Sequence, residues 1–93
     1  MKPAVGRVVY TIYQYQISEE IVGYLGKDSF IVLNFEDYDC SYEFEYEDYN
    51  KHWFTSFSKA KACLKKLFKE NFPEEKFKLI EHKSFSGTRF WDV

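Results

Sequence analysis

One segment of the chain, after the aromatic pair Trp53-Phe54, has apolar residues spaced with the period of an α-helix. At about 100° per residue, these apolar residues share one arc of roughly 100°, and most of the lysines lie outside it. The residues of the arc are Phe57, Ala60, Leu64, Leu67 and Phe68. Thr55 or Ser56 can cap the start, and Pro73 ends the segment. The pattern predicts one amphipathic helix of about fifteen residues, which must pack on another element because so short a helix is marginal alone.

The other apolar residues alternate with polar ones or form short β-branched and aromatic runs, which is typical of strands. The pattern predicts five strands, at residues 8–17, 21–25, 30–35, 42–47 and 77–82. The second and third form a hairpin around a turn that contains Gly26. Strands that precede a single late helix predict one α+β domain over residues 1–93. We expect four or five antiparallel strands with the helix packed on one face.

The expected core joins the helix to the strands. The helix residues Phe57, Leu64, Leu67 and Phe68 should contact the first strand and three further residues, namely Val32, Tyr42 and Phe44. Near the C-terminus, Phe90 and Trp91 are expected to dock on the domain, because exposed aromatic residues would need a partner.

Composition and charge narrow the class of protein. Aromatic residues make up 22 % of the 93 residues and supply much of the core of a single domain. The net charge of −2 is split, with a net −7 in residues 1–50 and a net +5 in residues 51–93. Mild overall acidity argues against a general nucleic-acid binder. With no apolar stretch of about 20 residues, we expect no membrane span and a cytoplasmic location, where the two cysteines stay thiols.

The sequence carries no recognised catalytic or metal-binding motif. The metal-ligand types Cys40, His52, Cys63 and His82 are separated by 12, 11 and 19 residues, which does not match zinc-ligand spacing. Spacing alone leaves a Cys–His pair open, since such partners meet in space. There is no glycine-rich phosphate loop and no G-x-S-x-G. We expect a protein that is not an enzyme, with no cofactor, no metal and no catalytic residue.

The most distinctive stretch runs from Glu36 to Asp48 and contains seven acidic residues and no basic one. The acidic residues are Glu36, Asp37, Asp39, Glu43, Glu45, Glu47 and Asp48, with Tyr38 and Tyr49 at the ends of the patch. In the predicted strand, Glu43, Glu45 and Glu47 point away from the helix at intervals of about 6.8 Å. Two interpretations remain open. The strand is either an edge charged against edge-to-edge pairing or a docking surface for a basic protein.

Two alternatives rest on the basic residues. Lys59, Lys65, Lys66 and Lys69 on the helix, with Arg89, could bind nucleic-acid phosphates, although exposed helix faces are commonly lysine-rich for solubility. The acidic strand of one copy could also meet the lysine face of another, which would make a self-associating accessory protein. The sequence leaves both a monomer and a homodimer open.

The segment that enters the helix is similar to one in small proteins of bacteria, their phages and mobile elements. These proteins share a W-F-S/T lead-in to an A-K-x-x-L helix, matched here by Trp53, Phe54, Thr55, Ala60 and Leu64. The resemblance implies an accessory or anti-defence role. The leading hypothesis is therefore a protein-binding module whose acidic Tyr/Glu strand imitates nucleic acid and inhibits a nucleic-acid-binding defence enzyme of the host.

Overall fold

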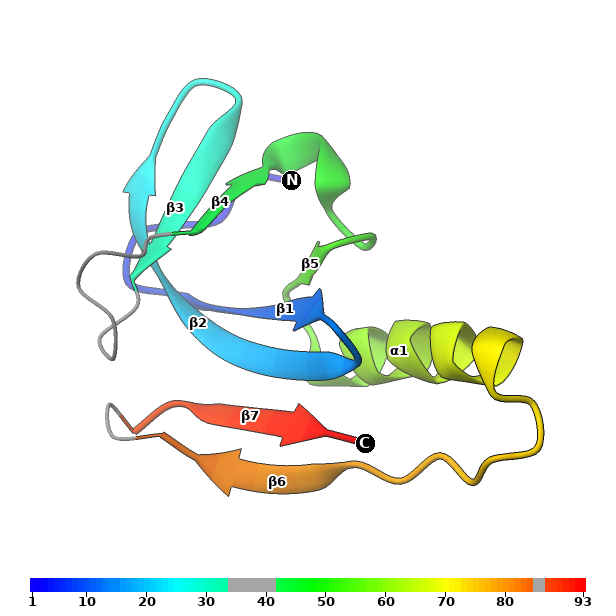
Figure 1. The fold of residues 1–93 in the computed structure, drawn as a ribbon. Helices are drawn as coiled ribbons and strands as arrows, with labels where there is room; N and C mark the ends of the chain where they lie inside the picture. The colour runs from blue at the N-terminus through cyan, green and yellow to red at the C-terminus, as the bar shows by residue number, and fades with distance from the viewer. Residues whose placement is uncertain (34–41, 85–86) are drawn as a thin grey trace.

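The computed structural model describes residues 1–33, 42–84 and 87–93 of the chain. The described elements follow one another along the chain as shown in Figure 1. They are β1 (Val8–Tyr13), β2 (Gln16–Leu25), β3 (Ser29–Leu33), β4 (Tyr42–Glu45), the 3₁₀-helix η1 (Tyr46–Asp48), β5 (Trp53–Phe54), α1 (Phe57–Asn71), β6 (Ile80–Lys83) and β7 (Arg89–Asp92).

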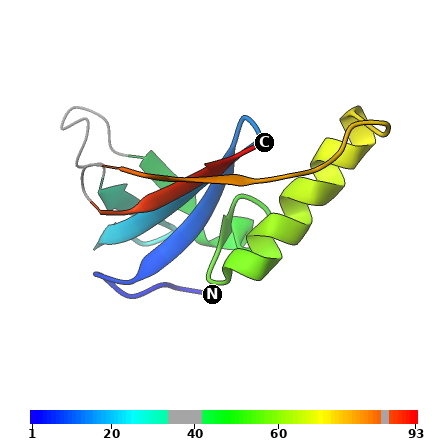
Figure 2. The same ribbon diagram turned by 90° about the horizontal axis from the view of Figure 1, so that it is seen from below.

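The described strands form one antiparallel sheet in the order β4-β3-β2-β1-β5, with β7 added to β2 and β6 added to β7. The long strand β2 organises this sheet. One of its edges pairs with β1 over residues 16–21, and its other edge pairs with β7 at residues 16–18 and with β3 from Ile21 onward. β3 and β7 pair with the same edge of β2 at different positions along that strand. The sheet therefore curls and opens between them (Figures 1 and 2). The α+β prediction is confirmed.

The inner face of the curled sheet holds one of two core clusters. Its buried members are Val9, Val22, Phe30, Val32 and Trp53. Phe30 and Trp53 belong to β3 and β5, which are not neighbours in the sheet, yet their ring centroids lie 4.9 Å apart. The Trp53 indole N–H also donates to the Glu45 carbonyl at 2.9 Å. The curl is therefore closed by aromatic packing together with a satisfied indole donor.

The helix α1 lies on the opposite, outer face and forms the second cluster with β1, β2, β5 and β7. Buried residues of this cluster are Ile17, Phe54, Ala60, Leu64 and Trp91. The Ser56 side chain caps the helix by accepting from the Lys59 N–H at 3.5 Å, and the helix ends at Asn71, before Pro73. The predicted helix, its cap and its contact with the first strand are confirmed.

The predicted strand at residues 8–17 is wrong, because the chain reverses inside it. Gln14 and Tyr15 have φ angles of 48° and 61°, so a two-residue left-handed turn joins β1 to β2. Such turns usually contain Gly or Asn, and this one contains neither. The Tyr15 ring packs on Phe68 and Phe72, with centroids 6.3 and 5.8 Å away, and this contact offsets the local strain.

Other boundaries also differ from the expectation. Trp53 and Phe54 form a short strand instead of a lead-in loop, and the last predicted strand begins at Ile80 instead of residue 77. The predicted strand at residues 42–47 ends at Glu45, where η1 begins. The chain end adds a further strand, in which Trp91 is docked with 6 % of its surface exposed. Docking of Trp91 is confirmed.

The predicted core contacts of the helix are corrected in two ways. Val32 and Phe44 belong to the inner cluster, and Tyr42 is 50 % exposed, so the helix packs on Ile17 and Phe54 instead. Leu67 is 42 % exposed, because the buried stripe runs through Ala60, Leu64 and Phe68. Among the described helices, none is long and apolar enough to span a membrane.

Candidate functional site

The acidic residues of β4 and η1 gather at one edge of the sheet. We call Glu43, Glu45, Glu47 and Asp48 the acidic cluster. Phe44 lies opposite Phe30 in the β3–β4 register and points to the inner face, so Glu43 and Glu45 point to the outer face. This is the face on which α1 packs, so the prediction that the glutamates point away from the helix is wrong. The Ser29 hydroxyl donates to Glu43 at 3.0 Å. Because Tyr46–Asp48 is a 3₁₀-helix, the predicted row of three glutamates along one strand stops at Glu45.

The carboxylates of the acidic cluster crowd one another. A side-chain hydrogen bond with Glu47 raises the pKa of Glu45 above its ordinary value, and the charges of Glu47, Asp48 and Glu43 add to the effect. None of the four forms an ion pair within the parts of the chain that the structure describes. Lys2 comes near, but its ammonium lies over the Tyr46 ring, 5.4 Å from the centroid. The cluster keeps a field of one sign.

The other residues predicted for the acidic patch either lie outside the described part of the chain or are partly buried. Glu36, Asp37, Tyr38 and Asp39 lie outside the described residues. Tyr49 is half-buried, and its ring packs 4.8 Å from Trp53 while its hydroxyl pairs with the Thr55 hydroxyl at 3.0 Å. Tyr49 therefore supports the fold, and only part of it reaches the surface.

An apolar surface next to the acidic cluster was not predicted. On the outer face, beyond the part that α1 covers, two rows of side chains run across neighbouring strands. Residues paired in register form each row: Val8, Ile21 and Leu33 in the first, and Tyr24, Ile31 and Glu43 in the second. We call their apolar members the outer apolar face: Val8, Ile21, Tyr24, Ile31 and Leu33. Tyr24, Val8 and Leu33 are 63, 43 and 43 % exposed. A β-bulge between Val22 and Tyr24 sets this arrangement, and the Leu33 side chain lies over Gly23. The second row ends at Glu43, so apolar and acidic surfaces are continuous.

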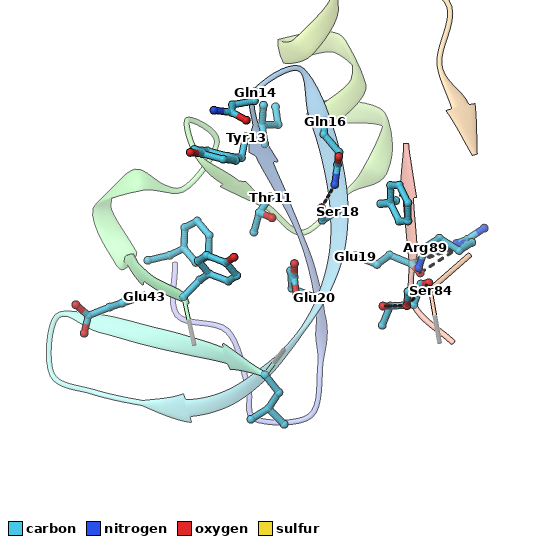
Figure 3. A pocket seen from close by; sticks show the side chains of 16 residues that line it. Thr11, Tyr13, Gln14, Gln16, Ser18, Glu19, Glu20, Glu43, Ser84 and Arg89 are labelled. Carbon is cyan, nitrogen blue, oxygen red and sulfur yellow. Dashed lines mark hydrogen bonds and ion pairs between the residues drawn. The ribbon is translucent and has the colours of Figure 1, made fainter. Parts of the chain in front are cut away.

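A cleft of about 640 Å³ opens on the inner face, where β3 and β7 diverge from β2. Figure 3 shows Thr11, Ser18 and Glu20 together on β1 and β2 at its centre. Aromatic side chains also line it, namely Tyr13, Tyr42, Phe44 and Phe90. Sequence reasoning missed this site because the missed turn at residues 14–15 hides which side of β2 each residue faces. The alternation of polar Gln16 and Ser18 with Ile17 was the available signal.

The basic residues do not form the surface predicted for nucleic-acid binding, in which Arg89 assists the helix lysines. Lys59, Lys65 and Lys66 are exposed on the helix and form no ion pair within the described residues, and the Lys69 ammonium donates to the Glu75 carbonyl. The Arg89 guanidinium contacts Glu19 at 2.8 Å and Glu81 at 3.4 Å and lies over Trp91. The Arg89 guanidinium is therefore engaged in contacts within the protein and does not extend the lysine surface of the helix.

The cysteines and histidines that the sequence analysis considered as metal ligands were checked for a cluster in the described chain. No three His, Cys, Asp or Glu side chains of the described residues are close enough to hold a metal ion. Cys63 is a half-buried free thiol on the helix, and His82 contacts Asp92 at 3.0 Å and stacks on Phe90. Cys40 lies outside the described residues.

No protein-family model matches the chain, and neither the curated proteins nor the solved structures give a significant match. The residues that carry the W-F-S/T and A-K-x-x-L resemblance serve the fold. Trp53, Phe54, Ala60 and Leu64 are buried, and Thr55 contacts Tyr49. Function must therefore be argued from the surfaces.

Proposed function

We propose that the chain is a non-enzymatic protein-binding module that presents the acidic cluster to a basic protein surface. The observation that carries this proposal is the crowding of Glu45 with Glu47 and Asp48, which raises the pKa of Glu45. Like charges held together without ion pairs cost stability in the free protein. A basic partner relieves that repulsion, so the free energy that the repulsion costs the folded protein is recovered when the partner binds.

The outer apolar face supplies the contact area that charge alone lacks. Protein interfaces combine an apolar centre with a polar rim, and here Tyr24 and Ile31 lie in register with Glu43. The apolar residues stabilise the complex, while the acidic rim steers the partner and sets its orientation. Tyrosine is among the residues that most often dominate interface energetics, and Tyr24 is 63 % exposed.

The chemistry of the partner follows from the sign of the charge. A surface of Lys and Arg that normally holds nucleic acid fits best, with the carboxylates in the places of phosphates. In its specific form, the proposal is that the chain serves a phage or mobile element by inhibiting a nucleic-acid-binding defence enzyme of the host. It predicts that the module and nucleic acid compete for one surface of the partner.

The test uses the triple variant Glu43→Gln, Glu45→Gln and Glu47→Gln, after the partner has been identified by cross-linking from residues of the outer apolar face. The variant should fold as the parent does or slightly more stably, because repulsion is removed. Its affinity for the partner should fall about tenfold at low salt and less at high salt. Titration calorimetry at two salt concentrations measures both effects.

A matched control removes the same charge elsewhere. Glu70, Glu74 and Glu75 are exposed at the far end of the helix and beyond it, and their replacement by Gln should leave the affinity within about twofold of the parent. Equal loss in both triple variants would show a general effect of net charge. A parent-like affinity of the first variant would refute the acidic docking surface.

A further inference from the structure

The cleft on the inner face lies where strand β1 leaves the packed core. Val9 is fully buried on this face, and Thr11 and Tyr13 follow it on the same side of β1. Thr11 is 6 % exposed, whereas Tyr13 is 74 % exposed. The inner face therefore passes, along a single strand, from the core through a polar floor to solvent.

The floor of the cleft consists of neutral polar groups. Thr11 pairs with Ser18 in the register of β1 and β2, so the two hydroxyls lie side by side (Figure 3). The Gln16 amide donates to the Ser18 hydroxyl at 3.2 Å. Gln14, in the left-handed turn, adds a second amide that is exposed at the lining. Hydroxyls and amides both donate and accept hydrogen bonds, so this floor suits a ligand that does the same.

Aromatic rings form the walls of the cleft, and two of these rings are held in place by their neighbours. Phe44, on β4, packs against the buried Phe30 with ring centroids 5.8 Å apart. Phe90, on β7, stacks on His82 at 4.8 Å. Tyr13 adds a third, exposed ring. Walls that are ordered before binding lose little conformational freedom when a ligand packs on them.

Charge does not select the ligand of this cleft. Arg89 is the one basic residue among the described lining residues, and its guanidinium contacts Glu19 at 2.8 Å and Glu81 at 3.4 Å. It is therefore not free to hold an anion. Glu20 has an interaction of its own within the protein, and Glu43 points away from the floor (Figure 3). We therefore expect an uncharged ligand.

Among uncharged ligands, the lining favours one that has both apolar faces and a polar rim. A purely apolar ligand would leave the hydroxyls and amides of the floor without hydrogen-bond partners, which weakens binding. A pyranose ring with equatorial hydroxyls meets both requirements. Its flat C–H faces pack on aromatic rings, and its hydroxyls donate to and accept from groups such as those of Thr11 and Ser18.

We propose that this cleft binds a neutral saccharide, with a pyranose ring packed on the aromatic walls and its hydroxyls bonded to the polar floor. The volume of the cleft is about 640 Å³. This value lies within the usual range of small-molecule pockets, roughly 300–1,000 Å³. The site is independent of the acidic docking surface, because it lies on the other face of the sheet and uses none of the residues of the acidic cluster.

The test titrates the full chain with cellobiose, a disaccharide of pyranose rings with equatorial hydroxyls, while ¹H–¹⁵N correlation spectra are recorded. Saturable shifts at millimolar cellobiose should be centred on the amides of Thr11, Ser18 and Phe90. Sorbitol, an acyclic polyol without a flat ring face, should cause none of them. Comparison with cellotetraose distinguishes the sources, since tighter binding of the longer chain indicates a stretch of polysaccharide and equal binding indicates a small free sugar.

Three variants assign the binding to the cleft. Tyr13→Leu removes an exposed ring, so it should weaken cellobiose binding severalfold without unfolding the domain. Thr11→Val removes one hydroxyl and keeps the β-branched shape, and it should weaken binding about threefold to tenfold. Thr55→Val makes the same chemical change at an exposed position outside the cleft and should bind as the parent does.

Four results would each overturn the proposal. They are the absence of saturable shifts with millimolar cellobiose, equal shifts with sorbitol, shifts centred on the acidic cluster, and a parent-like affinity of either Tyr13→Leu or Thr11→Val. None of these results bears on the partner affinity of the triple glutamine variant, so the two proposals can fail separately.

Discussion

At the scale of single residues, the ion pair between Glu19 and Arg89 ties the C-terminal strand to the centre of the sheet. Burial by itself raises the pKa of Glu19, but hydrogen bonds and charge from Arg89 outweigh it and leave the pKa below its ordinary value of 4.5. Glu19 also accepts from the Arg89 backbone N–H at 2.8 Å. The Glu19 side chain is 12 % exposed and Arg89 is 41 % exposed, so solvent weakens the pair from one side only.

Glu19→Gln should therefore lower the free energy of unfolding by about 1–2 kcal/mol at pH 7. A lowered pKa stabilises the folded state above the unfolded pKa and loses this effect as the pH falls through the folded pKa. The difference between parent and variant should thus shrink as the pH drops below 4.5. Urea unfolding at several pH values measures it. Glu81→Gln, an exposed contact of the same Arg89, should change stability by less than about 0.5 kcal/mol, and an equal effect would contradict this account.

At the scale of elements, the helix shows how one stripe of residues holds two layers together. Leu64 is fully buried in the outer cluster, whereas Leu67, three residues later, is 42 % exposed. The helical period of the sequence placed both leucines in one arc. The sheet beneath α1 is curled, however, and contacts only part of that arc. The width of a buried stripe depends on the surface that covers it, which the sequence of the helix does not contain.

Leu64→Ala should lower the free energy of unfolding by about 2–5 kcal/mol, because it leaves a cavity in the core. Leu67→Ala makes the same chemical change at a partly exposed site and should cost less than about 1 kcal/mol. Thermal or urea unfolding of the two variants gives the comparison. A cooperative Leu64→Ala variant with unchanged melting would show that the helix is wrongly placed.

At the scale of the whole molecule, the charges are separated in space as well as in sequence. β4 and η1, which carry the acidic cluster, lie apart from α1 in Figure 1, and no ion pair joins this cluster to the lysines of α1 within the described residues. The lysines therefore do not neutralise the acidic cluster. The same layout leaves head-to-tail association of two copies open, and it opposes the approach of a long polyanion to the lysine face.

We expect no binding of a short DNA duplex or RNA strand at micromolar protein and physiological salt. The four exposed lysines of α1, namely Lys59, Lys61, Lys65 and Lys66, give few phosphate contacts without Arg89. The acidic side of the domain repels the remaining phosphates of the nucleic acid. Fluorescence anisotropy of labelled nucleic acid tests this. Binding that falls steeply with salt and is lost in a Lys59, Lys65 and Lys66 to Gln variant would favour nucleic-acid binding through the helix instead.

The sequence by itself determined the α+β class, the helix with its Ser56 cap, the hairpin of β2 and β3, and the acidic strand. Each of these depends on local physics: the period of apolar residues, a hydroxyl that caps free N–H groups, a glycine-containing turn, and alternation along a strand. Neighbouring residues are enough to express such preferences. The presence of the acidic cluster could be predicted for the same reason.

Only the tertiary structure decided where the surfaces lie. The turn at Gln14 and Tyr15 has no glycine, and the rings of Phe68 and Phe72 that support Tyr15 come from the far end of the helix. Missing that turn hides which residues of β2 face inward, and with them the cleft. The outer apolar face needs Val8, Ile21 and Leu33 from three strands in register. Such contacts join residues distant in the chain, so their energies appear only once the sheet has curled and closed.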